Sequence, residues 1–138
     1  MVLARASTFY IGGINVREIK FRGWNKELNN FIYVETILLQ EYNNRWVMLV
    51  DNELGEEWVY IEEPQQYTGL KDKNGKEIYE GDIVIAYDEM TDAICKGQIV
   101  WDECECGFCI KGSEPTFIGY YPELEVIGNI YENLELVN

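Results

Sequence analysis

The chain has 138 residues, of which 47% are hydrophobic and 14% aromatic, and its formal net charge is −14. This length fits one domain or two small lobes. No apolar run approaches the roughly 20 residues that cross a bilayer, so we expect a cytoplasmic protein with a packed core and no membrane partner. Histidine is absent, which excludes His-based acid–base catalysis, Ser–His and Cys–His nucleophile pairs, and zinc sites of mixed ligation.

The charge is unevenly distributed along the chain. Residues 1–50 carry six basic and four acidic side chains, whereas residues 51–138 carry five basic and 21 acidic ones. Because binding to phosphate backbones depends on clustered Lys and Arg, the C-terminal part should repel nucleic acid. Two interpretations stay open: the acidic surface keeps the protein in solution, or it imitates nucleic acid or docks on a basic partner protein.

The start of the chain differs from the rest, and we interpret residues 1–15 as a non-native extension or a disordered tail. Gly12 and Gly13 can be encoded by a ribosome-binding sequence two codons ahead of a GTG start that is read as Val16. This reading places the true start further downstream. A signal peptide is disfavoured, because the residues around Arg5 leave its apolar centre too short.

Residues 16–64 form a predicted β-rich N-terminal lobe. Over residues 17–24, apolar and charged side chains alternate, which is typical of a half-buried strand. A polar turn then leads to residues 31–39, where β-branched side chains favour a second strand. We therefore expect an antiparallel hairpin. Apolar residues at helical spacing between Phe31 and Tyr42 leave a helix open as the alternative.

The second half of this lobe contains three further segments. Asn43-Asn44 predicts a turn, and residues 45–50 read as a buried strand. We expect an acidic loop over residues 51–57 and a short strand over residues 58–61. Pro64 ends this strand, because proline cannot donate to a ladder, and it marks the expected lobe boundary.

Residues 66–84 predict a hairpin followed by a bend. Asn74-Gly75 suits a type I′ turn, because both residue types tolerate positive φ. Gly81 permits a bend, and Asp82 can accept hydrogen bonds from nearby amides. A phosphate-binding loop is excluded, because five residues rather than four separate the candidate glycines and Glu77 stands where a hydroxyl is needed.

The last part of the chain predicts five short strands. They cover residues 83–87, 94–101, 108–111, 116–121 and 126–131, and Pro122 is expected in a single helical turn between the last two. Five strands at this spacing resemble a small SH3-like barrel, a fold that implies no function by itself. The expected fold is mainly β, with α+β as the alternative: a hairpin-rich lobe over residues 16–64 and an SH3-like barrel over residues 65–138.

Four cysteines form the strongest candidate for a metal site. Cys95, Cys104, Cys106 and Cys109 could supply four thiolates to zinc. Only one Cys-x-x-Cys pair exists, however, and free cysteine often behaves as a small buried apolar residue. A disulfide is disfavoured in the cytoplasm. We therefore expect no metal and no cofactor.

Other candidate sites are weaker. Glu18-Ile19-Lys20 matches half of a metal-dependent nuclease motif, but no aspartate precedes it. The four tryptophans could stack bases or sugars, although core and interface roles suit aromatics better. They are Trp24, Trp46, Trp58 and Trp101.

Three segments carry a family resemblance. They are Gln-Tyr-Thr-Gly-Leu-Lys-Asp-Lys-Asn-Gly-Lys-Glu-Ile-Tyr-Glu-Gly-Asp-Ile-Val at residues 66–84, Arg-Glu-Ile-Lys-Phe-Arg-Gly-Trp at residues 17–24 and Glu-Val-Ile-Gly-Asn-Ile-Tyr-Glu-Asn at residues 125–133. These segments resemble the YopX family, small proteins carried mostly by bacteriophages and prophages. The resemblance implies no established activity. The turn residues in the motif favour a structural role; its members are Tyr67, Thr68, Gly69, Leu70, Asp72, Asn74, Gly75, Ile78, Tyr79, Gly81, Asp82, Gly128 and Asn129.

These observations favour a non-enzymatic, acidic protein-interaction module that acts on a host or phage protein in the cytoplasm of the host bacterium. The alternative is a nucleic-acid-associated module that uses a basic contact set in the N-terminal lobe. This set is Arg17, Lys20, Arg22 and Lys26. A carboxylate-dependent hydrolase is a more distant alternative. Exposed strand edges also predict a homo-oligomer.

Overall fold

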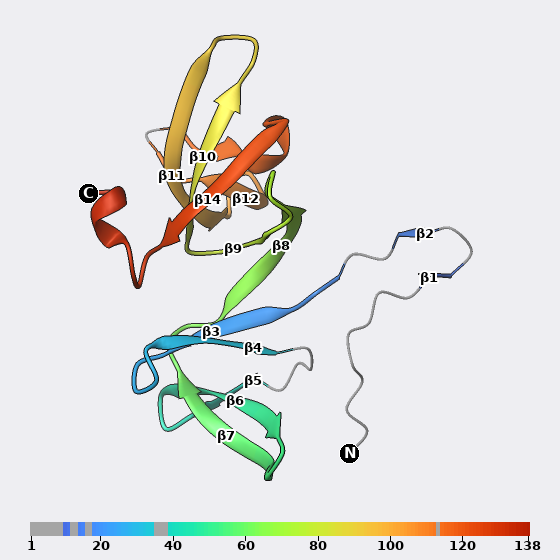
Figure 1. The fold of residues 1–138 in the computed structure, drawn as a ribbon, viewed down its shortest axis with the longest axis vertical. Coiled ribbons are helices and arrows are strands. Elements are labelled where there is room, and N and C mark those ends of the chain that lie inside the picture. The colour runs from blue at the N-terminus through green and yellow to red at the C-terminus, as the bar shows by residue number, and fades with distance from the viewer. Residues whose placement is uncertain (1–9, 12–13, 16–17, 35–38, 113) are drawn as a thin grey trace. The chain divides into compact units, whose positions relative to one another are not determined.

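The structure, a computed structural model, describes residues 10–11, 14–15, 18–34, 39–112 and 114–138. Strands dominate this part of the chain, which contains two short 3-10 turns and no α-helix (Figure 1). The prediction of a mainly β fold is therefore confirmed. None of the helical turns in these ranges has the length or apolarity to cross a membrane.

The chain divides into two compact units, which we call unit 1 (Met1–Tyr67) and unit 2 (Thr68–Asn138). The boundary expected from the sequence, between residues 64 and 65, lies shortly before this division. Within residues 1–15, the structure describes only a short antiparallel pair, β1 (Tyr10–Ile11) and β2 (Ile14–Asn15). The interpretation of residues 1–15 as a non-native or disordered segment stays a prediction.

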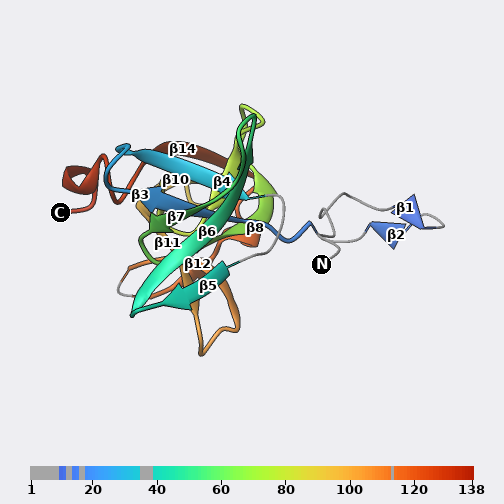
Figure 2. The same cartoon turned by 90° about the horizontal axis from the view of Figure 1, so that it is seen from below.

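Unit 1 is built from antiparallel hairpins. Its main strands are β3 (Phe21–Asn25), β4 (Asn30–Val34), β5 (Leu39–Tyr42), β6 (Arg45–Asn52) and β7 (Gly55–Ile61). The predicted first hairpin is present as β3 and β4, and the first residues of β8 (Gln65–Lys71) pair with β3. The strands β5, β6 and β7 form a separate three-stranded sheet (Figure 2).

Two turns in unit 1 bear on the predictions. Asn43 and Asn44 have φ values of 50° and 59°, as a type I′ turn requires, and join β5 to β6. The expected acidic loop over residues 51–57 is wrong: β6 and β7 stay paired up to Asn52 and Gly55, so only Glu53 and Leu54 turn the chain. Acidic side chains on an exposed ribbon do not prevent the backbone from pairing.

The core of unit 1 is small and contains polar groups. Met48 and Ile61 are buried, and Phe21 and Ile32 pack against them. The Arg22 guanidinium is also buried, where its Nε donates a 2.9 Å hydrogen bond to Gln65 Oε1. Buried polar groups keep such partners because an unsatisfied group costs free energy.

Unit 2 contains a curled five-stranded sheet. Its strands are β10 (Asp82–Asp88), β11 (Ala93–Asp102), β12 (Gly107–Ile110), β13 (Thr116–Phe117) and β14 (Glu123–Asn129), in the order β13-β12-β11-β10-β14. The last strand therefore pairs with the first, and a 3-10 turn, η1 (Ile118–Tyr120), precedes β14. Both features agree with the predicted SH3-like small barrel.

One face of this sheet forms the larger core of the molecule. Its buried members are Ile78, Val84, Ala86, Ile99, Phe108, Ile110, Ile118 and Leu124. Ile78 comes from β9 (Glu77–Tyr79), which lies beside β8. A second 3-10 turn, η2 (Leu134–Leu136), follows the sheet near the end of the chain.

Two local predictions in unit 2 need correction. Asn74-Gly75 does not form a type I′ turn, because only Gly75 has a positive φ, 81°. The Gly75 amide instead donates to Asp72 O at 3.0 Å, so the turn spans residues 72–75. The Asp72 side chain stabilises this turn by accepting hydrogen bonds from the amides of Asn74 and Lys76. The helical turn expected at Pro122 lies earlier, at η1, because a proline ring disfavours the helical region for the residue before it.

Candidate interaction surfaces

The hairpin of the family motif is held together by its own side chains. Asp72 Oδ1 accepts hydrogen bonds from the amides of Asn74 and Lys76, both at 2.9 Å, and its Oδ2 accepts one from Val126 at 3.1 Å. Burial opposes ionisation of Asp72, but these amides outweigh it and hold the pKa of the carboxyl below its ordinary value. One carboxylate thus closes the turn and ties it to β14.

The bend at residues 80–82 has a similar internal structure. Gly81 has a φ of 79°, its amide donates to Ile99 O, and its carbonyl accepts from Ile130. Asp82 is buried and accepts a 2.9 Å hydrogen bond from the Tyr79 amide, as the sequence predicted for a turn aspartate. These contacts join the motif to β11 and to Ile130, the residue that follows β14.

The other motif residues also have contacts within the fold. Thr68 Oγ1 donates to Ile78 O at 2.8 Å, and Tyr67 is buried with the Lys20 ammonium 4.8 Å from its ring centre. Asn129 Oδ1 accepts from the amides of residues 131 and 132. A Cβ at Gly128 would lie 2.8 Å from Asn133 Cβ, so only glycine fits there. Gly69 has a φ of 89°, and Leu70 is partly exposed beside it.

The structure does not bring the four cysteines together. Cys104 and Cys106 are exposed in the turn between β11 and β12, whereas Cys109 is buried. Burial raises the pKa of the Cys109 thiol, which favours the neutral form. Cys109 pairs with Val100, five positions along β11 from Cys95, a separation of about 17 Å at the usual rise per residue. Among the described residues, no three Cys, Asp or Glu side chains gather as metal ligands do.

The proposed basic contact set does not form a continuous exposed patch. Arg22 is only 2% exposed and lies 3.9 Å from the Phe31 ring centre. Lys20 forms an ion pair with Glu18 at 3.1 Å, and Lys26 forms one with Glu62 at 2.9 Å. Arg17 lies outside the described residues. Within that part of the chain, Arg22 contributes to the core of unit 1 and is not accessible to a phosphate.

The tryptophans have different environments. Trp24 is buried and packs edge-on against Phe31, with ring centres 4.9 Å apart. Trp101 is half exposed and packs against Phe108, its partner across the strands. Trp46 and Trp58 lie on β6 and β7 and are partly exposed. Because Trp24 is buried, the four tryptophans do not form one exposed stacking surface.

One side of the β6–β7 ribbon carries an exposed group that we call the aromatic face. Directly paired residues share a side of a sheet, so the pairs Val47–Tyr60 and Leu49–Trp58 lie on the same side. Trp58 and Tyr60 are 46% and 38% exposed. Arg45 stacks over Tyr60, with its Cζ 3.9 Å from the ring centre. The aromatic face consists of Arg45, Leu49, Trp58 and Tyr60.

Acidic residues border the aromatic face at the turn. Asp51–Glu56 is the next pair on this side of the ribbon, after Leu49–Trp58. Beyond it, Leu54 in the turn is 99% exposed. This surface was not predicted from the sequence, because residues 51–57 were expected to form a loop. Trp58, Glu56 and Asp51 lie on one side of the ribbon because side chains continue to alternate through residues 51–58. That alternation was the signal that could have predicted the surface.

Comparisons with known proteins agree with this fold. A family model described as YopX protein matches residues 20–138. The crystal structure of protein EF1440 from Enterococcus faecalis is similar, with a TM-score of 0.52 and 24% identity, covering 87% of this chain and 98% of that one. At this level of identity the likeness concerns the fold alone. A search of curated proteins found no significant match.

Proposed function

The chain belongs to the YopX family, as its motifs predicted, and from that premise we propose that it is a non-enzymatic protein-interaction module of phage or prophage type. It binds a basic surface of a host or phage protein in the cytoplasm of the host bacterium. The aromatic face, bordered by Asp51 and Glu56, is the observation that carries this proposal. The family motif supports the fold and makes no contact with the partner.

The composition of the aromatic face suits protein binding. Tyrosine, tryptophan and arginine are enriched in interfaces and in the residues that dominate binding energy. Here Trp58, Tyr60 and Arg45 lie next to one another, and the Arg45 stack limits the motion of the Tyr60 ring. Side chains that are already ordered lose less entropy on binding.

The acidic border indicates the charge of the partner. Asp51 and Glu56 are directly paired across the strands, and like charges in that position destabilise a ribbon. A Lys or Arg from a partner would relieve this repulsion while its neighbouring apolar residues cover Trp58. A basic partner is thus favoured over nucleic acid, whose phosphates these carboxylates repel.

Pull-down from lysate of the bacterial host tests the proposal. Tagged full-length protein should recover one protein in stoichiometric amount, identified by mass spectrometry, and its affinity is then measured with the purified partner. We expect the double variant Trp58→Ala/Tyr60→Ala, and separately Asp51→Lys/Glu56→Lys, to weaken binding at least about tenfold, as hot-spot residues do. Trp101→Ala, which removes a similarly exposed tryptophan from unit 2, is the matched control and should bind normally.

Two outcomes would contradict the proposal. Recovery of nucleic acid in a salt-dependent manner would support the alternative module. Equal binding by the two double variants and by wild type would place the contact elsewhere. Circular dichroism of each variant shows whether the ribbon is still folded, so that loss of binding is not confused with loss of structure.

A further inference from the structure

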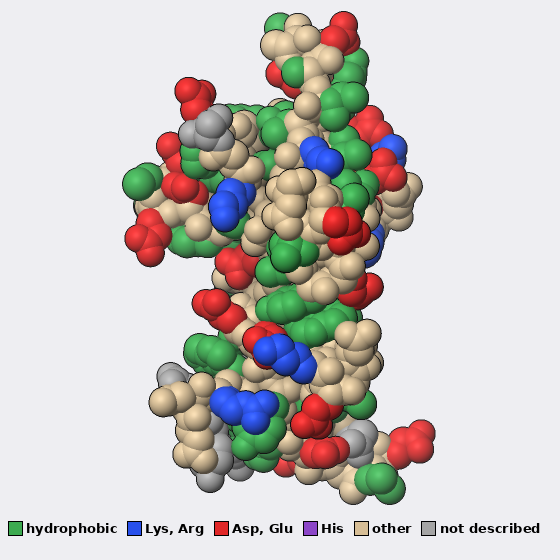
Figure 3. Space-filling model, turned by 90° about the vertical axis from the view of Figure 1, so that its left-hand side faces the viewer, with side chains coloured by type: hydrophobic (Ala, Val, Ile, Leu, Met, Phe, Trp, Pro, Cys, Tyr) green, Lys and Arg blue, Asp and Glu red, His purple; other side chains and the backbone are tan. Residues whose placement is uncertain are grey.

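The hairpin formed by β10 and β11 ends in an exposed tip, residues 87–94. The hairpin projects past the rest of the sheet of unit 2 (Figure 1), and acidic and hydrophobic side chains gather at its end, at the top of Figure 3. Pairing of β10 with β14 stops at Tyr87, so beyond this point the two strands pair only with each other. Met90 and Ile94 are 93% and 71% exposed.

Hydrogen bonds fix the shape of this tip. Asp88 accepts bonds from the Met90 amide and the Thr91 hydroxyl, both at 2.9 Å. The Tyr87 hydroxyl donates to Asp92 Oδ1 at 2.5 Å, and Asp92 has a φ of 54°. The tip therefore holds Met90 outward between carboxylates in an ordered turn. Such order reduces the entropy lost when the tip binds.

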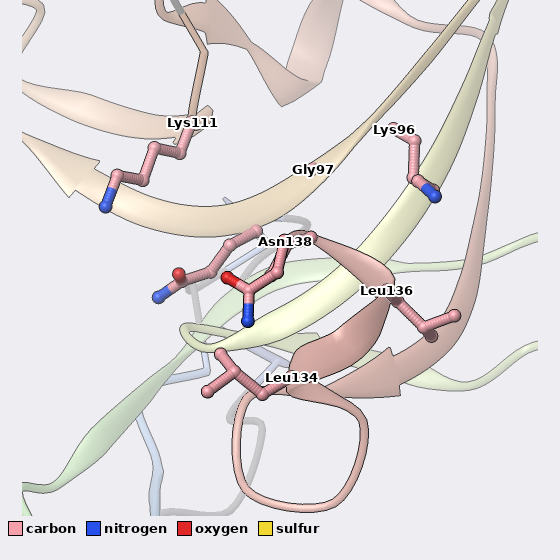
Figure 4. Close-up of a pocket in the computed structure, with 8 residues that line it drawn as sticks. Lys96, Gly97, Lys111, Leu134, Leu136 and Asn138 are labelled. Carbon is pink, nitrogen blue, oxygen red and sulfur yellow. The ribbon is translucent and has the colours of Figure 1, made fainter.

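A groove of opposite charge lies on the same unit, with a volume of about 460 Å³. We call it the basic groove. Lys96 and Lys111 stand at its two ends, and Leu134, Leu136 and Asn138 lie across from the strand that carries Gly97 (Figure 4). Unit 2 has five lysines, and these are the two outside the motif hairpin. No carboxylate of the described residues forms an ion pair with either one.

The tip and the basic groove match in chemistry. The tip offers an unbranched apolar side chain, Met90, flanked by Asp88, Glu89 and Asp92. Between its two lysines, the groove offers the aliphatic side chains of Leu134, Leu136 and Val137 beside the amides of Gln98 and Asn138. Met adapts to irregular apolar sites, and complementary charge selects partners and fixes their orientation.

The register makes a reciprocal contact feasible. Ile94, Lys96 and Gln98 alternate along β11 and so lie on one side of the hairpin, which Tyr87 shares as the partner of Ile94. Along β11, four positions separate Ala93, at the base of the turn, from Gly97, about 13 Å of strand. Two copies placed antiparallel on this side would each lay a tip over the other copy's groove. Such an isologous contact closes as a two-fold dimer and does not extend into a filament.

We propose that a second copy of this chain occupies the basic groove: the tip of each copy, residues 87–94, inserts Met90 between Lys96 and Lys111 of the other. The contact lies wholly within unit 2. It is separate from partner binding by the aromatic face of unit 1.

Exchange of charges between the two surfaces tests the dimer. Sedimentation equilibrium of the full chain should show a concentration-dependent dimer. Glu89→Lys changes the tip without removing the Asp88 or Asp92 hydrogen bonds, and Lys96→Glu/Lys111→Glu changes the groove. Each variant alone should associate at least about tenfold more weakly, because like charges then face each other. A mixture of the two variants should form a heterodimer, since each tip then meets a groove of opposite charge.

Exposed charged residues outside the tip and the basic groove provide the controls. Glu103→Lys makes the same change in net charge as Glu89→Lys, and Lys71→Glu makes half the change of the double groove variant. Both lie at exposed sites outside both surfaces and should dimerise as wild type does. Met90→Ser should weaken the dimer without altering charge. A wild-type chain that stays monomeric at about 1 mM, or a mixture that fails to associate, overturns the inference. Partner binding by unit 1 would survive that failure, and Trp58→Ala/Tyr60→Ala should leave the dimer unchanged.

Discussion

The two units obtain their stability in different ways. Among the described residues, the core cluster of unit 2 has eight buried apolar members on one face of a curled sheet. The corresponding cluster in unit 1 has two, Met48 and Ile61, supported by Phe21 and Ile32. Unit 1 adds buried polar contacts: Arg22 with Gln65, and Asn25, whose side chain joins Leu28 to Tyr60.

Unit 2 therefore holds the larger buried core, whereas unit 1 leaves large apolar side chains exposed to solvent. Small units bury a limited share of their surface and are marginally stable, yet unit 1 leaves Trp58 and Tyr60 partly in solvent. Apolar area that faces water contributes nothing to the fold. The family motif, by contrast, lies mainly in unit 2, where its hydrogen bonds complete the barrel. We therefore expect unit 2 to have the larger free energy of unfolding and unit 1 to unfold first.

The largest expected effect follows from truncating the core of unit 1. Met48 is fully buried, and Met→Ala in a core costs about 2–5 kcal/mol. Because the cluster of unit 1 has so few members, we expect Met48→Ala to unfold that unit while unit 2 stays protected. Hydrogen exchange, followed separately for peptides on the two sides of residue 68, measures this.

A matched substitution in the larger core provides the control. Ile78→Ala removes a fully buried side chain from unit 2 at a similar cost, but seven other cluster members remain. Its peptides should exchange faster by sub-global opening while the barrel still folds. Equal loss of protection in both units after Met48→Ala would contradict the separation proposed here.

An intermediate effect is expected at Asp72. Asp72→Ala leaves three backbone amides without their acceptor, which should lower the free energy of unfolding by about 2–3 kcal/mol. Urea unfolding at neutral pH measures the change. Asp102→Ala is the control: it removes an exposed carboxylate that accepts from one amide, Glu105, and should cost clearly less.

The Asp72 contribution should also depend on pH. The pKa of Asp72 is lowered in the folded protein from an ordinary value near 3.8, so the carboxylate stabilises the fold at pH values above that ordinary value. The stabilisation disappears as pH falls through the folded pKa. The stability difference between wild type and Asp72→Asn should therefore shrink below about pH 3.8. A difference that stays constant down to pH 2 would show that the charge of Asp72 is unimportant.

The sequence predicted elements more reliably than connections. The apolar content of their segments located β3, β6, β10 and β11. In β11 the buried residues Gly97 and Ile99 alternate with more exposed neighbours, whereas β3 and β10 are buried over consecutive residues. The loop expected at residues 51–57 was wrong, since composition suggested solvent but could not show backbone pairing. The prediction of a type I′ turn at Asn74 was wrong because hydrogen bonds to the Asp72 side chain stabilise a different turn.

Surfaces were harder to predict than strands, for a related reason. The aromatic face depends on which residues of β6 and β7 are paired, and register follows from a two-residue turn that the sequence did not indicate. The basic groove joins Lys96, Lys111 and η2, which are far apart in the chain. Such groupings follow from tertiary packing alone. Arg22 shows the converse: a cation taken for a surface contact lies in the core.

The smallest expected effect compares one turn from each unit. Gly75 in unit 2 has a φ of 81°, and a Cβ there would meet no atom within 4 Å. Gly75→Ala therefore tests backbone strain alone and should cost about 1 kcal/mol. In unit 1, Asn44 has a φ of 59° in a type I′ turn; Asn44→Gly should change stability by less than about 0.5 kcal/mol, because both residues accept this conformation.

Urea midpoints of Gly75→Ala and Asp72→Ala distinguish the cost of backbone strain from the cost of lost hydrogen bonds. If Gly75→Ala costs as much as Asp72→Ala, then the turn at residues 72–75 depends on its backbone conformation as much as on the carboxylate that closes it. If it costs about 1 kcal/mol, the hydrogen bonds of Asp72 dominate. That second result is expected, because the Asp72 carboxylate connects the turn to Lys76 and to Val126 of β14, whereas Gly75 affects only its own φ.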